Sequence, residues 1–558
     1  MLVIGAGING ACIAYDAALR GLTVLLVDKK DFGGETSSGC FKIIHGGQRY
    51  LQHLNFKRLY ESAMEQQVLR FIAPHLVRPF SFLVPCYGFG MKGKELLRLG
   101  FWLYQQITRN KNKGLSKELH IPKTKILSKS EVEEAFPTLP KKNLRGGVLY
   151  SDCQISNCER LTLSFVLGAK ELGATVLNYV QAEKFSFSAD AIEEVTLKDC
   201  LTEKLITVKP KVVVNAAGPW IDEIWKNKAE TQYAHHGVYS KGVQLVVSKK
   251  LSSFAVAIES SHKDTGASFS RGGRSYFVVP WREHSLVGTA DVVYKGEPNN
   301  FSISETEIKD FLEEVNSAFT SPWLKRSDVT WSFGGLRPMS EESLNEMNQG
   351  REINASTIGA SRKDKVIDLE VENKTLANAI TMRGVKYTTS RRLAVKAVDL
   401  ACEKLKKAKA NSVSHVVRLP GGDFDELEKL KSEIKAKFQI TLSEQTLNHL
   451  LSNYGTLTNS ILKLIKETPE LGNKLSGSDT YLQAEVVYVV REEMVHTLSD
   501  VVFRRCGMGT LGYPDKSLIE EVSHIIKREL HWSEERRLLE IENLDRDFLK
   551  NLSGLVTT

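Results

Sequence analysis

Three glycines near the start of the chain have the spacing of a dinucleotide-binding turn. Gly5, Gly7 and Gly10 form a G-x-G-x-x-G motif, and Asp28 follows at about the separation, roughly 20 residues, that the motif expects. In such a turn the first glycine permits a tight bend, the second lets the backbone approach a diphosphate, and the third lets a helix pack against a strand. The acid accepts hydrogen bonds from a ribose. These residues predict that the chain binds NAD or FAD, and the motif alone does not choose between the two.

The elements around these glycines are those that the motif requires. Residues 1–4 form an apolar run typical of a buried strand, the pattern over 11–20 is helical, and 22–27 predicts a second strand. A helix that begins at the glycines directs free N–H groups and the positive end of its dipole at a diphosphate.

The segment after Asp28 carries glycines and hydroxyl residues in an order that a known family shares. It reads Asp31-Phe-Gly-Gly-Glu-Thr36-Ser37-Ser38, and then Lys42-Ile-Ile-His45-Gly46-Gly-Gln-Arg49-Tyr50. Both stretches closely resemble the FAD-dependent glycerol-3-phosphate dehydrogenases, and further matches in the same order cover nearly the whole chain. One of them, Asn215-Ala-Ala-Gly218-Pro-Trp220, ends an apolar run. An enzyme that uses only NAD does not need this sequence, so it favours a flavin.

The resemblance implies where FAD binds. The Thr-Ser-Ser segment would lie beneath the diphosphate and ribityl chain, where small hydroxyl residues donate hydrogen bonds. The loop 384–391 resembles the family's G-x-K-x-T-T-x-R loop, although the family often has paired glycines here, and the helix expected at 392–408 would point its N-terminus at the flavin ring. The predicted cofactor-binding residues are Gly5, Gly7, Gly10, Asp28, Thr36, Ser37, Ser38, His45, Gly46, Val180, Gly218, Gly384 and Thr388.

The resemblance also implies a reaction, the oxidation of sn-glycerol 3-phosphate to dihydroxyacetone phosphate by hydride transfer to FAD, with a quinone as the final acceptor. This reaction needs a base for the hydroxyl proton and an anchor for the phosphate. His45 is the candidate base because imidazole titrates near neutral pH, and His235 and His236 are weaker alternatives.

Cationic side chains are the natural anchors for a phosphate. By resemblance Arg49, Arg337 and Lys386 converge above the flavin, and Lys241 is a further residue that could line the pocket. The sequence therefore predicts His45, Arg337 and Lys386 as catalytic residues, and Arg49, Arg337 and Lys386 as substrate-binding residues. No metal site is expected.

Two alternatives stay open. The first is an enzyme on the same scaffold, either a glycerophosphate oxidase that uses oxygen or an amine or amino-acid oxidase. Amine oxidases bind a carboxylate and have less use for three cations, so the cations favour a phosphate. The second is a catalytically silent FAD-binding scaffold, against which the retained His45, Arg337 and Lys386 argue.

The order of predicted elements indicates an α/β fold in three parts, as expected for a chain of 558 residues. A Rossmann-type FAD-binding domain is expected from residues 1–75, 145–225 and 330–405. An antiparallel-sheet substrate domain is expected from 76–144 and 226–329. The charged, helical remainder, 415–558, would form a C-terminal helical domain with a structural or partner-binding role.

Composition excludes some classes of protein. A net charge of +8 without a recognisable nucleic-acid-binding module gives no support for a nucleic-acid partner. Eight scattered cysteines indicate packed thiols in a reducing compartment. No apolar run reaches the roughly 18 residues of a membrane span, and no signal peptide is recognised.

The stretch 92–113 combines basic residues with Phe101-Trp-Leu-Tyr104. It predicts either a surface helix with one apolar face or an interfacial helix on an acidic membrane surface. We therefore expect a cytoplasmic protein bound peripherally to the inner face of the cell membrane, and a homodimer stays an open alternative.

Overall fold

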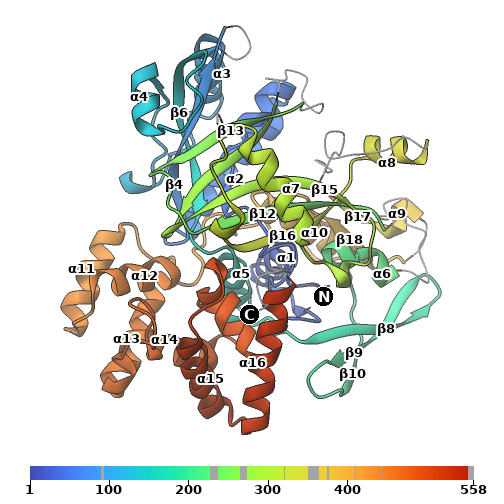
Figure 1. The fold of residues 1–558 in the computed structure, drawn as a ribbon. Helices are drawn as coiled ribbons and strands as arrows, with labels where there is room; N and C mark the ends of the chain where they lie inside the picture. The colour runs from blue at the N-terminus through green and yellow to red at the C-terminus, as the bar shows by residue number, and fades with distance from the viewer. Residues whose placement is uncertain are drawn as a thin grey trace.

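The computed structural model describes residues 1–89, 93–225, 237–263, 273–319, 321–349, 364–373, 376–408, 410–439 and 441–550. Two large sheets and a small one form the β-structure of these residues. The helices that follow residue 426, orange to red in Figure 1, gather at one end of the molecule. Of the helices in the described ranges, none combines the length and the apolar character of a membrane span.

The first large sheet is the predicted Rossmann sheet. Its strand order is β17-β18-β11-β1-β2-β7, and all neighbours are parallel except β17 and β18. Parallel strands covered on both faces are apolar throughout, and accordingly every residue of β1 is buried. The strands are β17 (Lys365–Asp368), β18 (Ala379–Arg383), β11 (Val213–Asn215), β1 (Leu2–Ile4), β2 (Leu25–Val27) and β7 (Thr175–Leu177).

A layer of helices covers this sheet. The helix α1 (Ile8–Leu19) packs between α5 (Cys158–Glu171) and α10 (Ser390–Lys404), and the three share a buried apolar cluster with the strands. The predicted helix at 11–20 is confirmed, but it begins three residues earlier, at Ile8, directly after the glycine turn.

The second large sheet has nine strands in the order β16-β12-β15-β14-β13-β4-β6-β3, with β5 paired to β6. All of its pairs are antiparallel except β13 with β4. The strands are β16 (Val329–Pro338), β12 (Tyr239–Val247), β15 (His284–Tyr294), β14 (Gly273–Trp281), β13 (Ala255–Lys263), β4 (Val77–Tyr87), β6 (Leu144–Ile155), β3 (Ile43–Ile44) and β5 (Lys125–Leu127).

This sheet draws on both of the predicted N-terminal domains. The strands β3, β6 and β16 lie in segments that the sequence assigned to the FAD-binding domain, yet they are hydrogen-bonded into the sheet of the substrate domain. The helices α4 (Lys129–Ala135) and α7 (Glu305–Asn316) pack on the sheet through a buried apolar cluster. The domain limits themselves stay a prediction.

Smaller elements complete the N-terminal part. A three-stranded antiparallel sheet of β8 (Val180–Ser188), β9 (Ala191–Asp199) and β10 (Leu205–Val208) projects to one side (Figure 1). The remaining helices are α2 (Phe56–Ile72), α3 (Lys94–Ile107), α6 (Ile221–Trp225), α8 (Glu341–Asn348), α9 (Leu369–Asn373) and the 3-10 turns η1 (Gln48–His53) and η4 (Gly218–Trp220).

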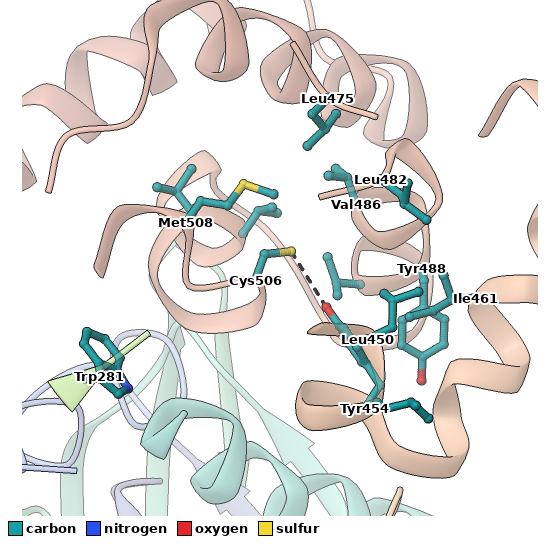
Figure 2. Close-up of a cluster of buried hydrophobic side chains, with 14 of the residues drawn as sticks. Trp281, Leu450, Tyr454, Ile461, Leu475, Leu482, Val486, Tyr488, Cys506 and Met508 are labelled. Atoms are coloured by element: carbon teal, nitrogen blue, oxygen red, sulfur yellow. Dashed lines mark hydrogen bonds between the residues drawn. The ribbon is translucent and has the colours of Figure 1, made fainter. Parts of the chain in front are cut away.

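The C-terminal domain is helical, as predicted. It contains α11 (Leu427–Phe438), α12 (Glu444–Tyr454), α13 (Thr458–Glu467), α14 (Gln483–Glu492), a π-helical turn η9 (Asp500–Arg505), α15 (Lys516–Leu530) and α16 (Glu534–Leu549). Figure 2 shows part of its core, in which Leu450, Tyr454 and Val486 pack beside Cys506 and Met508. Trp281 of β14 belongs to the same buried cluster, so the core continues from these helices into the nine-stranded sheet.

Candidate active site

The loops that could hold a dinucleotide meet at one edge of the Rossmann sheet. The strands β18, β11, β1 and β2 are neighbours and parallel, so their carboxyl ends lie at the same edge. The glycine turn follows β1, Asp28 follows β2, Gly218 lies after β11, and the loop of Gly384 follows β18. A dinucleotide binds at this edge of an open α/β sheet.

The glycines at this edge allow backbone contacts that a side chain would block. A Cβ on Gly10 would lie 1.8 Å from the carbonyl oxygen of Gly5, and one on Gly5, whose φ is +95°, would lie 2.8 Å from that of Ala216. Gly384 packs against the first turn of α1, because its Cβ would lie 2.3 Å from Nδ2 of Asn9. The three loops therefore meet at the N-terminus of α1.

The N-terminus of α1 is built to receive an anion. Gly7 is its N-cap and offers no capping side chain, and the first turn of this fully described helix carries no acidic residue. The N–H of Ile8 donates to Oγ of Ser37 at 2.9 Å, and a Cβ on Gly7 would lie 3.0 Å from that oxygen. A helix N-terminus with this lining fits a diphosphate.

Asp28 lies at the end of β2, where the ribose would bind. Its Oδ2 accepts from the N–H of Ala6 at 2.7 Å, and its Oδ1 accepts from the N–H of Lys30 at 2.9 Å. Burial raises the pKa of Asp28 to about 6, although both hydrogen bonds act to lower it. The carboxylate therefore titrates close to neutral pH.

The other predicted cofactor-binding residues surround the same loops. The N–H of Val180 donates to the carbonyl of Asp28 at 2.7 Å. Gly218 has a φ of +56°, and nothing among the described atoms would lie within 4 Å of its Cβ. Thr36 donates from Oγ1 to the carbonyl of Leu336 on β16 at 3.3 Å. The segment of Thr36 therefore joins the cofactor edge to the nine-stranded sheet, and the loops taken together fit FAD.

His45, the predicted base, follows β3 and pairs with a carboxylate. Its Nδ1 lies 3.2 Å from Oδ2 of Asp152 on β6, and its ring contacts that of Phe277 on β14 with 6.2 Å between the centroids. The side chain of His45 is 44% exposed, whereas that of Asp152 is 0% exposed. The imidazole therefore reaches solvent while its partner is fixed in the interior.

Several donors hold Asp152 ionised. Its Oδ1 accepts from the N–H of Gly46 at 2.7 Å, from Nε2 of Gln66 at 2.8 Å and from Nε2 of Gln48 at 3.1 Å. Burial alone would raise the pKa of Asp152, but the hydrogen bonds from His45, Gly46 and Gln48 lower it below its ordinary value. An ionised carboxylate orients the imidazole so that Nδ1 carries the proton and Nε2 is the acceptor.

Arg337 is bound to a carboxylate on the neighbouring part of the sheet. Its Nη2 donates to Oδ1 of Asp291 on β15 and lies 3.5 Å from Oγ of Ser240 on β12. The side chains of Arg337 and Asp291 are both about one-third exposed. The guanidinium can therefore meet a soluble anion, in competition with Asp291.

The other predicted cations differ in their surroundings. Nζ of Lys386 lies 4.2 Å from the centre of the Tyr50 ring. The side chain of Arg49, together with all of His235 and His236, lies outside the described residues. Lys241 is buried and forms an ion pair with Glu307 at 2.7 Å.

Two acidic residues of the site were not among the predicted site residues. Asp152 stands 107 residues from His45, and Asp291 stands 46 residues from Arg337. Only the pairing of strands brings these two acids to their partners. Within the described ranges, no group of three His, Cys, Asp or Glu residues could hold a metal ion.

Comparisons with known proteins agree with this geometry. Residues 1–387 match the family described as FAD dependent oxidoreductase. The chain belongs to this family. Its cofactor is FAD, as predicted, and residues 412–537 of this FAD-dependent oxidoreductase match the C-terminal domain of alpha-glycerophosphate oxidase.

The curated relatives of this oxidoreductase include several glycerol-3-phosphate dehydrogenases. The chain is 31% identical over 515 residues to the glycerol-3-phosphate dehydrogenase of Synechocystis sp., which covers 90% of this chain and 88% of the relative. It is 28% identical over 520 residues to the aerobic glycerol-3-phosphate dehydrogenase of Staphylococcus epidermidis, covering 91% and 86%.

A solved structure shares the fold. The glycerol-3-phosphate dehydrogenase from Bacillus halodurans, complexed with FAD, superposes with a TM-score of 0.73 at 24% identity, covering 100% of this chain and 96% of that one. The predicted fold class, a Rossmann-type FAD-binding domain with a substrate-domain sheet and a C-terminal helical domain, is confirmed.

Proposed function

We propose that this FAD-dependent oxidoreductase oxidises sn-glycerol 3-phosphate to dihydroxyacetone phosphate. The observation that carries the proposal is the pair of His45 and Asp152. The imidazole of His45, which follows β3, reaches solvent and is bound by the buried carboxylate of Asp152 on β6. The names of the curated relatives, which align over about nine-tenths of the chain, support the choice of substrate.

In this proposal His45 removes the hydroxyl proton of the substrate. Asp152 accepts the hydrogen bond from Nδ1, so Nε2 is free to accept the proton, and the carboxylate stabilises the imidazolium that results. When bound, FAD supplies a two-electron acceptor for the hydride of the alcohol carbon. Removal of one proton and one hydride from the secondary alcohol leaves the ketone.

Arg337, Lys386 and Arg49 would bind the phosphate. A guanidinium makes two parallel hydrogen bonds to phosphate oxygens, and an ammonium adds a point charge. The phosphate would compete with Asp291 for Arg337, because that carboxylate already accepts from Nη2. Exchange of one anion for another lets the free enzyme keep its arginine paired and oriented.

We further propose that the protein is cytoplasmic, binds an acidic membrane surface peripherally and passes its electrons to a quinone there. The helix α3 supports the membrane contact, because Leu96, Leu99 and Trp102 are 42%, 60% and 56% exposed, whereas only Phe101 and Tyr104 are buried. Exposed apolar side chains beside cations suit an interfacial helix. Lys92, at the start of the predicted stretch, lies outside the described residues.

The anaerobic reaction with substrate tests the proposal. The purified protein should be yellow, and sn-glycerol 3-phosphate should bleach the flavin absorbance and release one dihydroxyacetone phosphate for each flavin. Glycerol, which has the alcohol but no phosphate, is the control and should bleach it poorly. A flavin that dithionite bleaches but the phosphorylated alcohol does not would reject this substrate.

One observation favours a second acceptor. Because residues 412–537 match the C-terminal domain of alpha-glycerophosphate oxidase, oxygen is an alternative to the quinone. Re-oxidation of the bleached flavin by air or by a soluble quinone analogue separates the two. A faster reaction with air would replace the quinone in the proposal and keep the substrate.

A further inference from the structure

Buried ion pairs join the C-terminal domain to the loop that follows Asp28. Arg505 of η9 binds both carboxylate oxygens of Asp31, with Nη1 2.6 Å from Oδ2 and Nη2 2.9 Å from Oδ1. Arg504, the preceding residue, donates from Nε to the same Oδ2. The side chains of Asp31 and Arg505 are each 1% exposed, so both charges lie in the interior.

The carboxylate of Asp31 depends on these arginines. Burial alone would raise its pKa, but Arg505 and Arg504 hold the pKa of Asp31 well below its ordinary value. Asn178 adds a bond from Nδ2 to Oδ1 of Asp31 at 2.9 Å. A buried carboxylate that loses its partner is strongly destabilised, because its charge is then neither solvated nor compensated.

The loop that Asp31 belongs to, residues 28–38, is the one that lines the cofactor edge. The N–H of Gly33 donates to the carbonyl of Ala6 in the glycine turn at 3.0 Å. Four residues later, Ser37 accepts from the N–H of Ile8 at the start of α1. Asp31 is therefore held by the C-terminal domain on one side, while the residues that follow it contact the diphosphate-binding turn on the other.

We propose that the C-terminal domain sets the affinity for FAD, with Arg504 and Arg505 as positioning residues that hold loop 28–38 in its cofactor-binding conformation. The arginines touch neither substrate nor reacting atoms in this scheme and act through Asp31. The proposal rests on FAD as the cofactor and is independent of the alcohol that is oxidised.

A second buried pair offers a matched control. Arg160 of α5 binds Glu493, which follows α14, with Nη2 2.8 Å from Oε1 and Nη1 2.9 Å from Oε2. Their side chains are 2% and 0% exposed. This pair also joins the C-terminal domain to the Rossmann helices, but neither residue belongs to loop 28–38.

The experiment compares Arg504→Gln and Asp31→Asn with Glu493→Gln. Each holoenzyme is diluted without substrate, and FAD release is followed by the fluorescence of the freed flavin, while thermal unfolding reports the fold. Arg504→Gln and Asp31→Asn should raise the Kd for FAD at least about tenfold, which corresponds to about 1.4 kcal/mol. Glu493→Gln should lower the melting temperature and leave the Kd close to that of the wild type.

Two results would overturn the proposal. One is an unchanged FAD affinity in Arg504→Gln, and the other is an equal loss of affinity in Glu493→Gln, which would mean that any weakened domain contact releases FAD. If Asp31→Asn does not fold, Arg504→Gln decides alone, because that side chain is 15% exposed and its replacement leaves Arg505 on Asp31. Since substrate is absent, a failure of the proposed reaction would not affect the outcome.

Discussion

The imidazole of His45 lies between solvent and the buried hydrogen-bond network around Asp152. Asp152 accepts four hydrogen bonds, from His45, Gly46, Gln48 and Gln66. These donors fix the position of the carboxylate and favour its ionised form. Such a carboxylate fixes the tautomer of its histidine partner and does not take up the proton itself. This arrangement supports the proposal that His45 is the base.

Replacement of His45 by glutamine should therefore affect the chemical step. We expect His45→Gln to lower kcat by about 10²-fold or more, because a positioned base contributes about 10²–10⁴-fold. Without an acceptor at this position the hydroxyl proton has no nearby base, so the flavin should be reduced slowly even when substrate saturates the enzyme. Stopped-flow flavin reduction under anaerobic conditions measures this step directly.

The FAD content of His45→Gln is the control and should stay normal. A rate of flavin reduction in the variant close to that of the wild type would assign the base to another residue.

Replacement of Arg337 should weaken binding of the substrate's phosphate group and should not impair oxidation of the alcohol group itself. We expect Arg337→Lys to lower kcat/KM about ten- to a hundredfold, because charge-assisted hydrogen bonds contribute about 1.5–3 kcal/mol each. Arg337→Ala should lower kcat/KM further, since it removes the charge and also leaves Asp291 without this partner. Steady-state rates with sn-glycerol 3-phosphate and with glycerol measure the effect.

Glycerol separates the anchor from a structural role. Arg337→Ala should oxidise glycerol no worse than the wild type does. An equal loss of activity with both substrates would show that Arg337 supports the fold or flavin binding and that the phosphate binds elsewhere.

Asp28 should make FAD binding depend on pH. Burial places the pKa of this carboxyl at about 6, and ribose hydroxyls donate to its ionised form, so bound FAD should lower that pKa. Protonation therefore opposes binding, and the Kd for FAD should rise as the pH falls through 6. Flavin fluorescence measured between neutral and mildly acidic pH tests this, and Asp28→Asn should flatten the dependence. A dependence unchanged in Asp28→Asn would assign it to another group.

At the scale of single residues, the sequence predicted His45 and Arg337 but not the carboxylates that bind them. The spacing of Gly5, Gly7 and Gly10 is local, because a turn and a helix start are built from consecutive residues, and it was predictable. The partners Asp152 and Asp291 reach His45 and Arg337 only through strand pairing over long separations, and no spacing rule encodes such contacts.

At the scale of single elements, the sequence predicted that α3 is a helix but not which of its apolar side chains other elements cover. Its pattern of apolar and basic residues predicted a helix with one apolar face, and the helix is confirmed at Lys94–Ile107. The pattern could not say whether another element covers that face. In the structure Phe101 stacks near Tyr150, with 4.9 Å between the ring centroids, while Leu99 and Trp102 face outward.

Polar substitutions on α3 should weaken membrane binding without unfolding the protein. We expect Leu99→Ser with Trp102→Ser to reduce binding to acidic liposomes at least about tenfold, because burial of each large apolar side chain contributes about 1.5–3 kcal/mol. Stability should change little, since both side chains are already exposed. Sedimentation with liposomes at low and high salt measures the binding.

The edge strand β10 supplies a matched control. Leu205 and Ile206 are 58% and 56% exposed, much like Leu99 and Trp102, but they lie on the small side sheet. Leu205→Ser with Ile206→Ser should leave liposome binding unchanged. Equal loss in both variants would mean that apolar exposure in general, and not α3, drives the contact.

At the scale of the whole molecule, one buried apolar cluster joins the C-terminal helices to the nine-stranded sheet. The buried cluster that contains Leu450 and Tyr454 of α12 also contains Trp281 of β14 and Trp331 of β16. The C-terminal helices and the nine-stranded sheet therefore bury their apolar surface against each other. Sequence patterns marked 415–558 as a separate helical domain, but they could not show this shared core, which exists only once the sheet is assembled.

Because of the shared core, the sheet and the C-terminal helices should unfold together. We expect Leu450→Ala to lower the free energy of unfolding by about 2–5 kcal/mol and to shift a single calorimetric transition as a whole. Leu538→Ala, at a site that is 52% exposed on α16, makes the same chemical change and should have little effect. Two separate peaks, of which Leu450→Ala moves only one, would contradict the shared core.

The strand order of the Rossmann sheet also bears on how the protein is made. The strand β1 is made before β2 and β11 but sits in the interior of the sheet, between them, and β18 beyond β11 is the last of the parallel strands. At about 5–20 residues per second, the stretch from Ile4, at the end of β1, to Ala379, at the start of β18, takes roughly 20–75 s to synthesise. During this time the growing sheet has an apolar edge strand, because β18, the last of its parallel strands, has not yet been made. A chaperone has that interval in which to shield the open edge of the sheet, first at β1 and then at β11. If Gly384 contacts FAD as proposed, the cofactor site is complete only after translation has passed this loop.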